Sequence, residues 1–136
     1  MDYKLIIKNI ESKKFEKIYF LHGEETHFID VITNAIIEHA LEDHERDFNQ
    51  SILYGKDSDA RSIMAEAKGY PMMAQRRLVI LKEAQNFRGI EDLKPYFESP
   101  SDQTIFVVNY KYKNYDSRKK AIKVVEKNGI VFKSDK

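Results

Sequence analysis

Short apolar runs that stop at a glycine or a charged residue alternate along this chain with segments of helical periodicity. The first such run, residues 17–22, is almost continuously apolar and ends before Gly23, which is typical of a strand buried on both faces. From residue 24 to residue 41 the apolar side chains recur every three or four positions, which indicates an amphipathic helix. The chain therefore begins with a strand, a turn and a helix.

The same pattern continues to the end of the sequence. We expect a short helix capped by Asp2 before the first strand, further strands at 48–54, 78–81, 104–108 and 130–132, and helices at 57–69, 90–97 and 117–127. Asp57 or Ser58 can cap the first of these later helices, and Pro71 suits the first position of another short helix at Met72. Because parallel strands need crossover helices, this alternation predicts an α/β fold, a three-layer sandwich around a five-stranded, mainly parallel sheet.

Length and composition restrict the classes of function. The chain has 136 residues, enough for one domain, and its 23 basic against 22 acidic residues leave a net charge of +1. That balance gives no global field for nucleic acid or an anionic membrane. The absence of cysteine excludes disulfides, thiolate nucleophiles and Cys-based zinc sites.

The two ends of the sequence carry signals of their own. The opening 15 residues contain no apolar run long enough for a signal peptide or a membrane span. We therefore expect a soluble, cytoplasmic protein with no membrane partner. Because the sequence stops directly after a strand-like segment, we also expect a fragment of a longer protein.

The loop after the first expected strand is where α/β proteins commonly bind phosphate. Here it reads HGEETHF, residues 22–28, and lacks the second glycine, the lysine and the following hydroxyl of a P-loop. Glu24 and Glu25 would repel phosphate at this helix start. Lys82 follows the third strand, where an ATPase of this architecture would place the aspartate that holds magnesium. The sequence thus predicts no functional nucleotide site and no cofactor.

No other arrangement of side chains indicates catalysis or metal binding. The histidines lack a ligand spacing, since His39 and His44 are five positions apart and lie off one helical face. We expect surface or capping roles for all four, His22 and His27 included. No serine or threonine stands in a nucleophile-elbow context. We therefore expect that the chain is not itself an enzyme.

Two segments remain as candidate binding surfaces. Residues 110–120, YKYKNYDSRKK, interleave aromatic and basic residues, so Arg118, Lys119 and Lys120 can contact DNA while the aromatics stack on bases. A solvated loop with Asp116 or Ser117 capping a basic helix is the alternative that we favour.

The second candidate is the methionine pair Met72 and Met73, which follows Pro71. Neighbours in a helical turn point about 100° apart, so both side chains can be buried only if the turn is covered from two sides. Methionine is adaptable and suits protein-binding surfaces, although it also fills cores. Both interpretations stay open from the residues alone.

Three segments together resemble the amino-terminal domain of delta subunits of the bacterial DNA polymerase III clamp loader. They are residues 18–25 (IYFLHGEE), 71–79 (PMMAQRRLV) and 116–120 (DSRKK), in the family's order and at similar spacing. The resemblance implies an AAA+-like fold that has lost ATP binding, and a chain (1–136) that lacks the family's lid and collar domains. Family members often have an aromatic residue where this chain has Met73.

The resemblance also implies a function and partners. Delta subunits bind and help to open the beta sliding clamp during DNA replication through a hydrophobic pair, which falls here on Met72 and Met73 beside Pro71. Other partners would be the gamma/tau and delta prime subunits, through regions mostly absent here, and DNA indirectly. Two alternatives are a degenerate nucleotide-binding ATPase domain and a single-stranded nucleic-acid-binding module.

Overall fold

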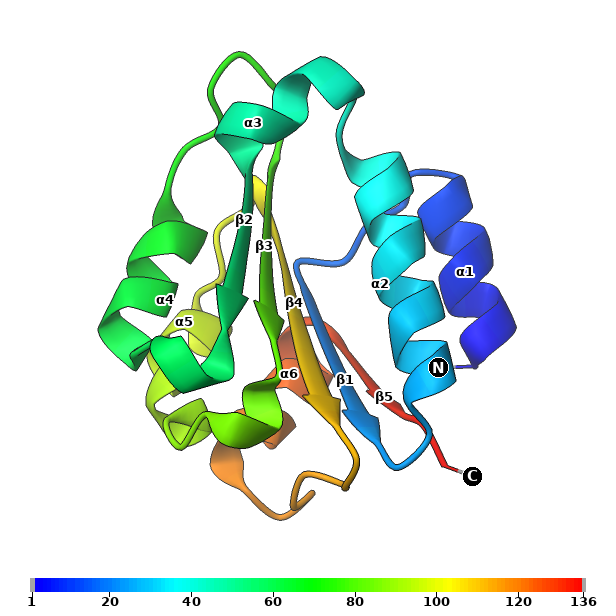
Figure 1. Cartoon of the computed structure of the whole chain (residues 1–136), viewed down its shortest axis with the longest axis vertical. Coiled ribbons are helices and arrows are strands. Elements are labelled where there is room, and N and C mark those ends of the chain that lie inside the picture. Colours follow the sequence, from blue (N-terminus) through cyan, green and yellow to red (C-terminus); the bar gives the residue numbers. More distant parts are fainter. Residues whose placement is uncertain (1, 136) are drawn as a thin grey trace.

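The computed structural model describes residues 2–135, and its strands and helices alternate through most of the chain (Figure 1). The elements are α1 (Tyr3–Glu11), β1 (Ile18–Gly23), α2 (Thr26–Ala40), α3 (Arg46–Asn49), β2 (Gln50–Tyr54), α4 (Ala60–Lys68), β3 (Arg77–Lys82), α5 (Lys94–Glu98), β4 (Thr104–Lys111), α6 (Lys120–Asn128) and β5 (Ile130–Lys133). Single 3₁₀ turns lie at Asp43–Glu45, Gly55–Asp57, Ala84–Asn86 and Ile90–Leu93.

The five strands form one sheet in the order β2-β3-β4-β1-β5, and every neighbouring pair is parallel. Phe106 of β4 lies at the centre, paired with Ile18 of β1 on one side and Val79 of β3 on the other. The expected α/β class is confirmed, with a sheet that is entirely parallel. All amino-terminal strand ends therefore meet at one edge of the sheet, and all carboxyl-terminal ends at the opposite edge.

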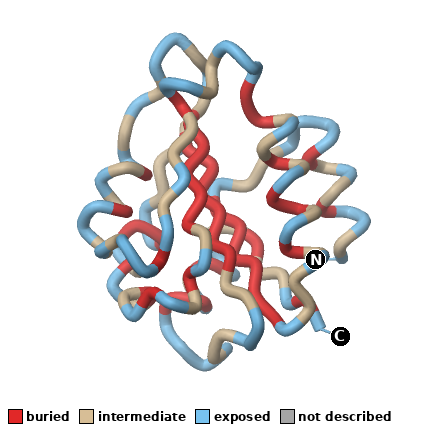
Figure 2. Tube along the Cα trace, in the orientation of Figure 1, coloured by how far each residue is buried: buried red, intermediate tan, exposed pale blue. Residues whose placement is uncertain are grey.

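Helices cover both faces of the sheet, and successive strand residues alternate between the two resulting cores. Tyr19 and Leu21 face α1 and α2, whereas Ile18 and Phe20 face α4, α5 and α6. The inner strands β1, β3 and β4 are buried along almost their whole length (Figure 2). This double burial explains why these strands read as continuous apolar runs in the sequence. Within residues 2–135, no helix is long and apolar enough to cross a membrane.

Several element boundaries differ from those expected from the sequence. Phe48 belongs to α3, so the strand expected from residue 48 begins at Gln50. The cap of α4 is Asp59, whose carboxylate accepts a hydrogen bond of 2.9 Å from the amide of Ser62. Because residues 55–57 form a 3₁₀ turn first, neither Asp57 nor Ser58 can cap this helix. The cap expected at Asp2 is confirmed.

The centre of the sheet should be the part most sensitive to truncation. Phe106 is fully buried, and its ring packs 5.5 Å from that of Tyr96 and 6.0 Å from that of Phe97, measured between centroids. Phe106→Ala should lower the free energy of unfolding by about 3–5 kcal/mol, because it leaves a cavity. Tyr70→Ala is the control, since Tyr70 is 82% exposed. Urea denaturation measures both, and equal small effects would contradict this view of the core.

Candidate functional site

The methionine loop, residues 69–76, joins α4 to β3 at the amino-terminal edge of the sheet, beside α3 (Figure 1). The expectation of a helix that starts at Met72 is wrong, because residues 70–76 contain no helical turn. The Asn49 side chain instead bonds the backbone of Met72 on both sides. Its Oδ1 accepts from the Met72 amide at 2.6 Å, and its Nδ2 donates to the Met72 carbonyl at 2.9 Å. Met73 follows with a left-handed backbone, φ 55°.

Both methionine side chains point into solvent. Met72 is 57% exposed and Met73 is 96% exposed. Neither side chain fills the core, so the core interpretation of this pair is wrong. Pro71, the third residue singled out with them, is partly buried. Water therefore surrounds two adjacent apolar side chains on a backbone that a buried amide holds in place.

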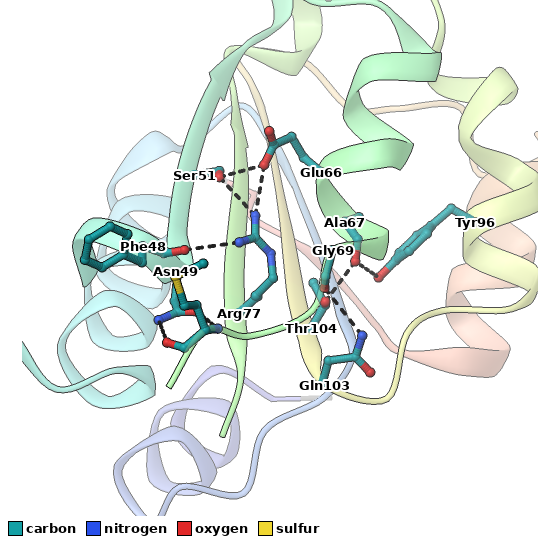
Figure 3. Close-up of polar contacts among 11 residues, drawn as sticks. Phe48, Asn49, Ser51, Glu66, Ala67, Gly69, Arg77, Tyr96, Gln103 and Thr104 are labelled. Carbon is teal, nitrogen blue, oxygen red and sulfur yellow. Dashed lines mark hydrogen bonds and ion pairs between the residues drawn. The ribbon is translucent and has the colours of Figure 1, made fainter. Parts of the chain in front are cut away.

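A buried arginine anchors the carboxyl-terminal end of the methionine loop. Arg77, the first residue of β3, is only 9% exposed, and its guanidinium reaches three elements (Figure 3). It donates to the Glu66 carboxylate at 2.9 Å, the Ser51 hydroxyl at 3.2 Å and the Phe48 carbonyl at 3.3 Å. The end of the loop is thereby tied to α4, β2 and α3 at once.

The amino-terminal end of the loop is anchored by groups that precede β4 or begin it. The Thr104 hydroxyl donates to the Ala67 carbonyl at 2.8 Å, and Gln103 donates to the Gly69 carbonyl at 3.4 Å (Figure 3). Within the loop, the guanidinium of Arg76 donates to the Ala40 carbonyl at 3.1 Å. Hydrogen bonds thus hold the methionine loop at several positions, although the loop lacks regular secondary structure.

Asn49 is the residue of this candidate site that the sequence did not reveal. It is fully buried, and its Nδ2 also donates to the Glu45 carbonyl at 2.9 Å. Its partner Met72 lies 23 positions away, so the sequence around Asn49 does not indicate this contact. The only local sign is an amide side chain at the boundary between α3 and β2.

Removing the Asn49 amide should loosen the methionine loop. Asn49→Ala leaves the amide and carbonyl of Met72 without their side-chain partner, so the free energy of unfolding should fall by about 1–3 kcal/mol. Hydrogen exchange of the Met72 amide should become faster. Asn34→Ala, at an exposed position of α2, is the control and should change neither quantity. Unchanged exchange at Met72 in Asn49→Ala would show that the amide does not hold the loop.

The loop after β1, at the opposite edge of the sheet, is closed by Ser134, which follows β5. Gly23 has φ 138°, and a Cβ atom there would lie 2.1 Å from the Ser134 carbonyl oxygen. That oxygen accepts from the Glu25 amide at 3.2 Å, and the Ser134 hydroxyl donates to the Glu25 carbonyl at 2.6 Å. Ser134 thus bonds a backbone amide that a phosphate-binding loop would direct at its anion.

His22, the last residue before Gly23, is buried at 3% exposure, so the surface or capping role expected for it is wrong. Its Nδ1 accepts a hydrogen bond of 2.9 Å from the Tyr115 amide, which requires a neutral ring nitrogen. Burial, with a smaller contribution from the Lys133 charge, lowers the pKa of His22 to about 4. The histidine is therefore a neutral structural group that holds the loop before α6.

This lowered pKa predicts a pH dependence of stability. The unfolded chain binds a proton at His22 near its ordinary pKa of 6.5, whereas the folded chain does so only near about 4. The contribution of His22 is therefore complete above pH 6.5 and is lost as the pH falls toward 4, by at most about 3 kcal/mol. His22→Asn keeps an acceptor without titrating and should flatten this part of the profile, measured by urea denaturation. His44→Asn, at an exposed position, is the control, and an unflattened profile in His22→Asn would contradict the assignment.

The second candidate surface of the sequence, residues 110–120, lies at the carboxyl-terminal edge, away from the methionine loop (Figure 1). The Arg118 guanidinium pairs with the Asp116 carboxylate through two bonds of 3.0 Å, which lowers the pKa of Asp116 to about 2. Lys119 and Lys120 are exposed. The structure thus separates Arg118, Lys119 and Lys120 from the methionines by the length of the sheet.

The start of α6 also differs from the expected capping. The helix begins at Lys120, and neither Asp116 nor Ser117 caps it. The Glu91 carboxylate accepts from the Ala121 amide at 3.1 Å and from the Tyr115 hydroxyl at 2.6 Å. In the part of the chain that the structure describes, no group of three or more potential metal ligands comes together.

Comparison with known proteins gives a consistent result. The family model for DNA polymerase III, delta subunit, matches residues 19–135. DNA polymerase III subunit delta of Bacillus subtilis (strain 168) is 26% identical over 137 residues, covering 93% of this chain and 40% of that protein. This chain thus spans about two fifths of the length of that curated relative.

Two solved structures share the fold. The Bacillus subtilis DNA clamp loader delta protein matches with a TM-score of 0.87 at 24% identity, over 98% of this chain and 42% of that one. A DNA polymerase III gamma subunit-related protein from Thermotoga maritima matches with a TM-score of 0.61 at 15% identity, over 98% and 46% of the two chains. At these identities the likeness concerns the fold, and it confirms the expected fold class.

Proposed function

Because this chain belongs to the DNA polymerase III delta subunit family, we propose that it is the clamp-binding, amino-terminal part of a clamp-loader delta subunit. In this proposal the methionine loop binds the beta sliding clamp in the cytoplasm and helps to open it for loading onto DNA. The chain performs no catalysis itself. Contacts with the gamma/tau and delta prime subunits would involve the remainder of the longer protein.

The observation that carries this proposal is the exposure of Met72 and Met73 on an anchored loop. Burying each side chain in an apolar pocket would contribute roughly 1.5–3 kcal/mol by area alone. The two hydrogen bonds between the Asn49 side chain and the backbone of Met72 hold that backbone before any partner binds, so less conformational entropy is lost on binding. A small, pre-ordered apolar contact of this kind fits a pocket on a protein surface.

Direct contact with DNA is not part of the proposal. The Arg118 charge is already compensated by Asp116, and the net charge of the chain is only +1. A nucleotide-dependent activity is not favoured either, because the Glu25 amide bonds Ser134 and Glu24 and Glu25 add negative charge at the same loop. Micromolar binding of ATP with magnesium would contradict this interpretation.

The double variant Met72→Ala with Met73→Ala tests the proposal. Binding to the sliding clamp of the same organism should weaken by well over tenfold, because truncating such anchors costs about 2 kcal/mol or more each. The thermal midpoint should stay within a few degrees of the unaltered chain, because both side chains are exposed. Calorimetric titration and thermal denaturation give the two quantities.

Met64→Ala is the matched control, since Met64 of α4 is partly buried against the core. It should lower the thermal midpoint and leave the clamp affinity unchanged. A double methionine variant with a strongly lowered thermal midpoint and full clamp affinity would contradict the proposal. It would show that the methionine pair supports the fold and does not bind the clamp.

A further inference from the structure

A phenylalanine beside the methionine loop is exposed and packs into neither core of the described residues 2–135. Phe48, on α3, is 67% exposed, although phenylalanine is among the side chains most often buried in proteins. It takes part in neither of the two cores that flank the sheet. Its side chain extends away from β2 and β3, while its carbonyl faces Arg77 (Figure 3).

Phe48 and the methionine loop are held together by the backbone on both sides of the phenylalanine. The next residue, Asn49, is the one that bonds the Met72 amide and carbonyl at 2.6 Å and 2.9 Å. The carbonyl of Phe48 itself accepts from Arg77, the residue directly after the loop, at 3.3 Å. These three hydrogen bonds join α3 and the methionine loop into one hydrogen-bonded unit.

Exposed apolar side chains are concentrated on this unit. Among residues 2–135, eight large apolar side chains are exposed, and four of them lie on α3 and the methionine loop: Phe48, Tyr70, Met72 and Met73. Exposed apolar side chains scattered singly are normal on a protein surface, whereas a cluster marks an interaction site. The cluster therefore extends beyond the methionine pair.

The charges next to Phe48 indicate what kind of partner fits. The segment before it carries four carboxylates, Glu42, Asp43, Glu45 and Asp47, against Arg46, which pairs with Asp43. An exposed aromatic ring can stack on a nucleic-acid base, but these carboxylates would repel the phosphate backbone. A protein surface is the partner that agrees with both the aromatic ring and its acidic surroundings.

We infer that Phe48 is a third anchor of the clamp-contact surface, beside Met72 and Met73, and that Asn49 and Arg77 position it there. This inference rests on the proposed function, and it commits the exposed face of α3 to the sliding clamp. Aromatic side chains are enriched among the few residues that carry most of the binding energy of an interface. Because its segment is already tied to the methionine loop, Phe48 loses little backbone freedom on binding.

The test is Phe48→Ala in the 136-residue chain, measured by titration against the sliding clamp of the same organism. We expect at least a tenfold loss of affinity with an unchanged thermal midpoint. Tyr112→Ala is the matched control, because Tyr112 is also aromatic and 68% exposed but follows β4 at the opposite edge of the sheet. Its clamp affinity should equal that of the unaltered chain.

The outcomes separate this inference from the proposed function. If the double methionine variant loses binding while Phe48→Ala keeps it, the third anchor is wrong and the proposed function stands. If neither variant loses affinity, or if the unaltered chain does not bind the clamp, the proposed function fails and the inference fails with it. A lowered thermal midpoint in Phe48→Ala would assign the ring to the fold and overturn the inference as well.

Discussion

Parallel pairing of all five strands is the constraint on which the rest of this structure depends. A parallel ladder gives every crossover the same direction, so segments that precede strands gather at one edge and segments that follow strands at the other. The methionine loop precedes β3, and the loop at Gly23 follows β1. The surface proposed for partner binding and the loop after β1, where α/β proteins commonly bind phosphate, are therefore separated by the whole sheet.

The sequence predicted the elements that depend on local apolar pattern. The inner strands are buried on both faces, and α1 and α2 keep an apolar stripe, so their periodicity is legible without tertiary information. Prediction from the sequence failed where a side chain distant in the sequence determines the backbone conformation. Pro71 suggested a helix, but Asn49 bonds the backbone of Met72. At α6, the carboxylate of Glu91 accepts from the Ala121 amide, 30 positions away in the sequence.

The candidate site was predictable in chemistry but not in geometry. Two adjacent methionines pointed to a surface or to the core, and only the fold shows both exposed. At Glu24, Glu25 and Lys82 the sequence has residues that differ from those of a nucleotide-binding motif. The contact that closes the loop after β1 could not be predicted from the sequence, because Ser134 lies 109 positions from Glu25. Likewise, nothing local to His22 indicates that its ring nitrogen accepts from Tyr115.

The left-handed backbone of Met73 limits which residues can replace it. β-branched side chains are strongly disfavoured at positive φ, so valine, isoleucine and threonine are poor substitutes, however apolar the first two are. Side chains unbranched at Cβ, such as leucine, phenylalanine or methionine, meet a smaller penalty, while glycine and asparagine tolerate the backbone but supply no apolar surface. The residues tolerated at position 73 should therefore be limited first by their compatibility with a positive φ and only then by their hydrophobicity.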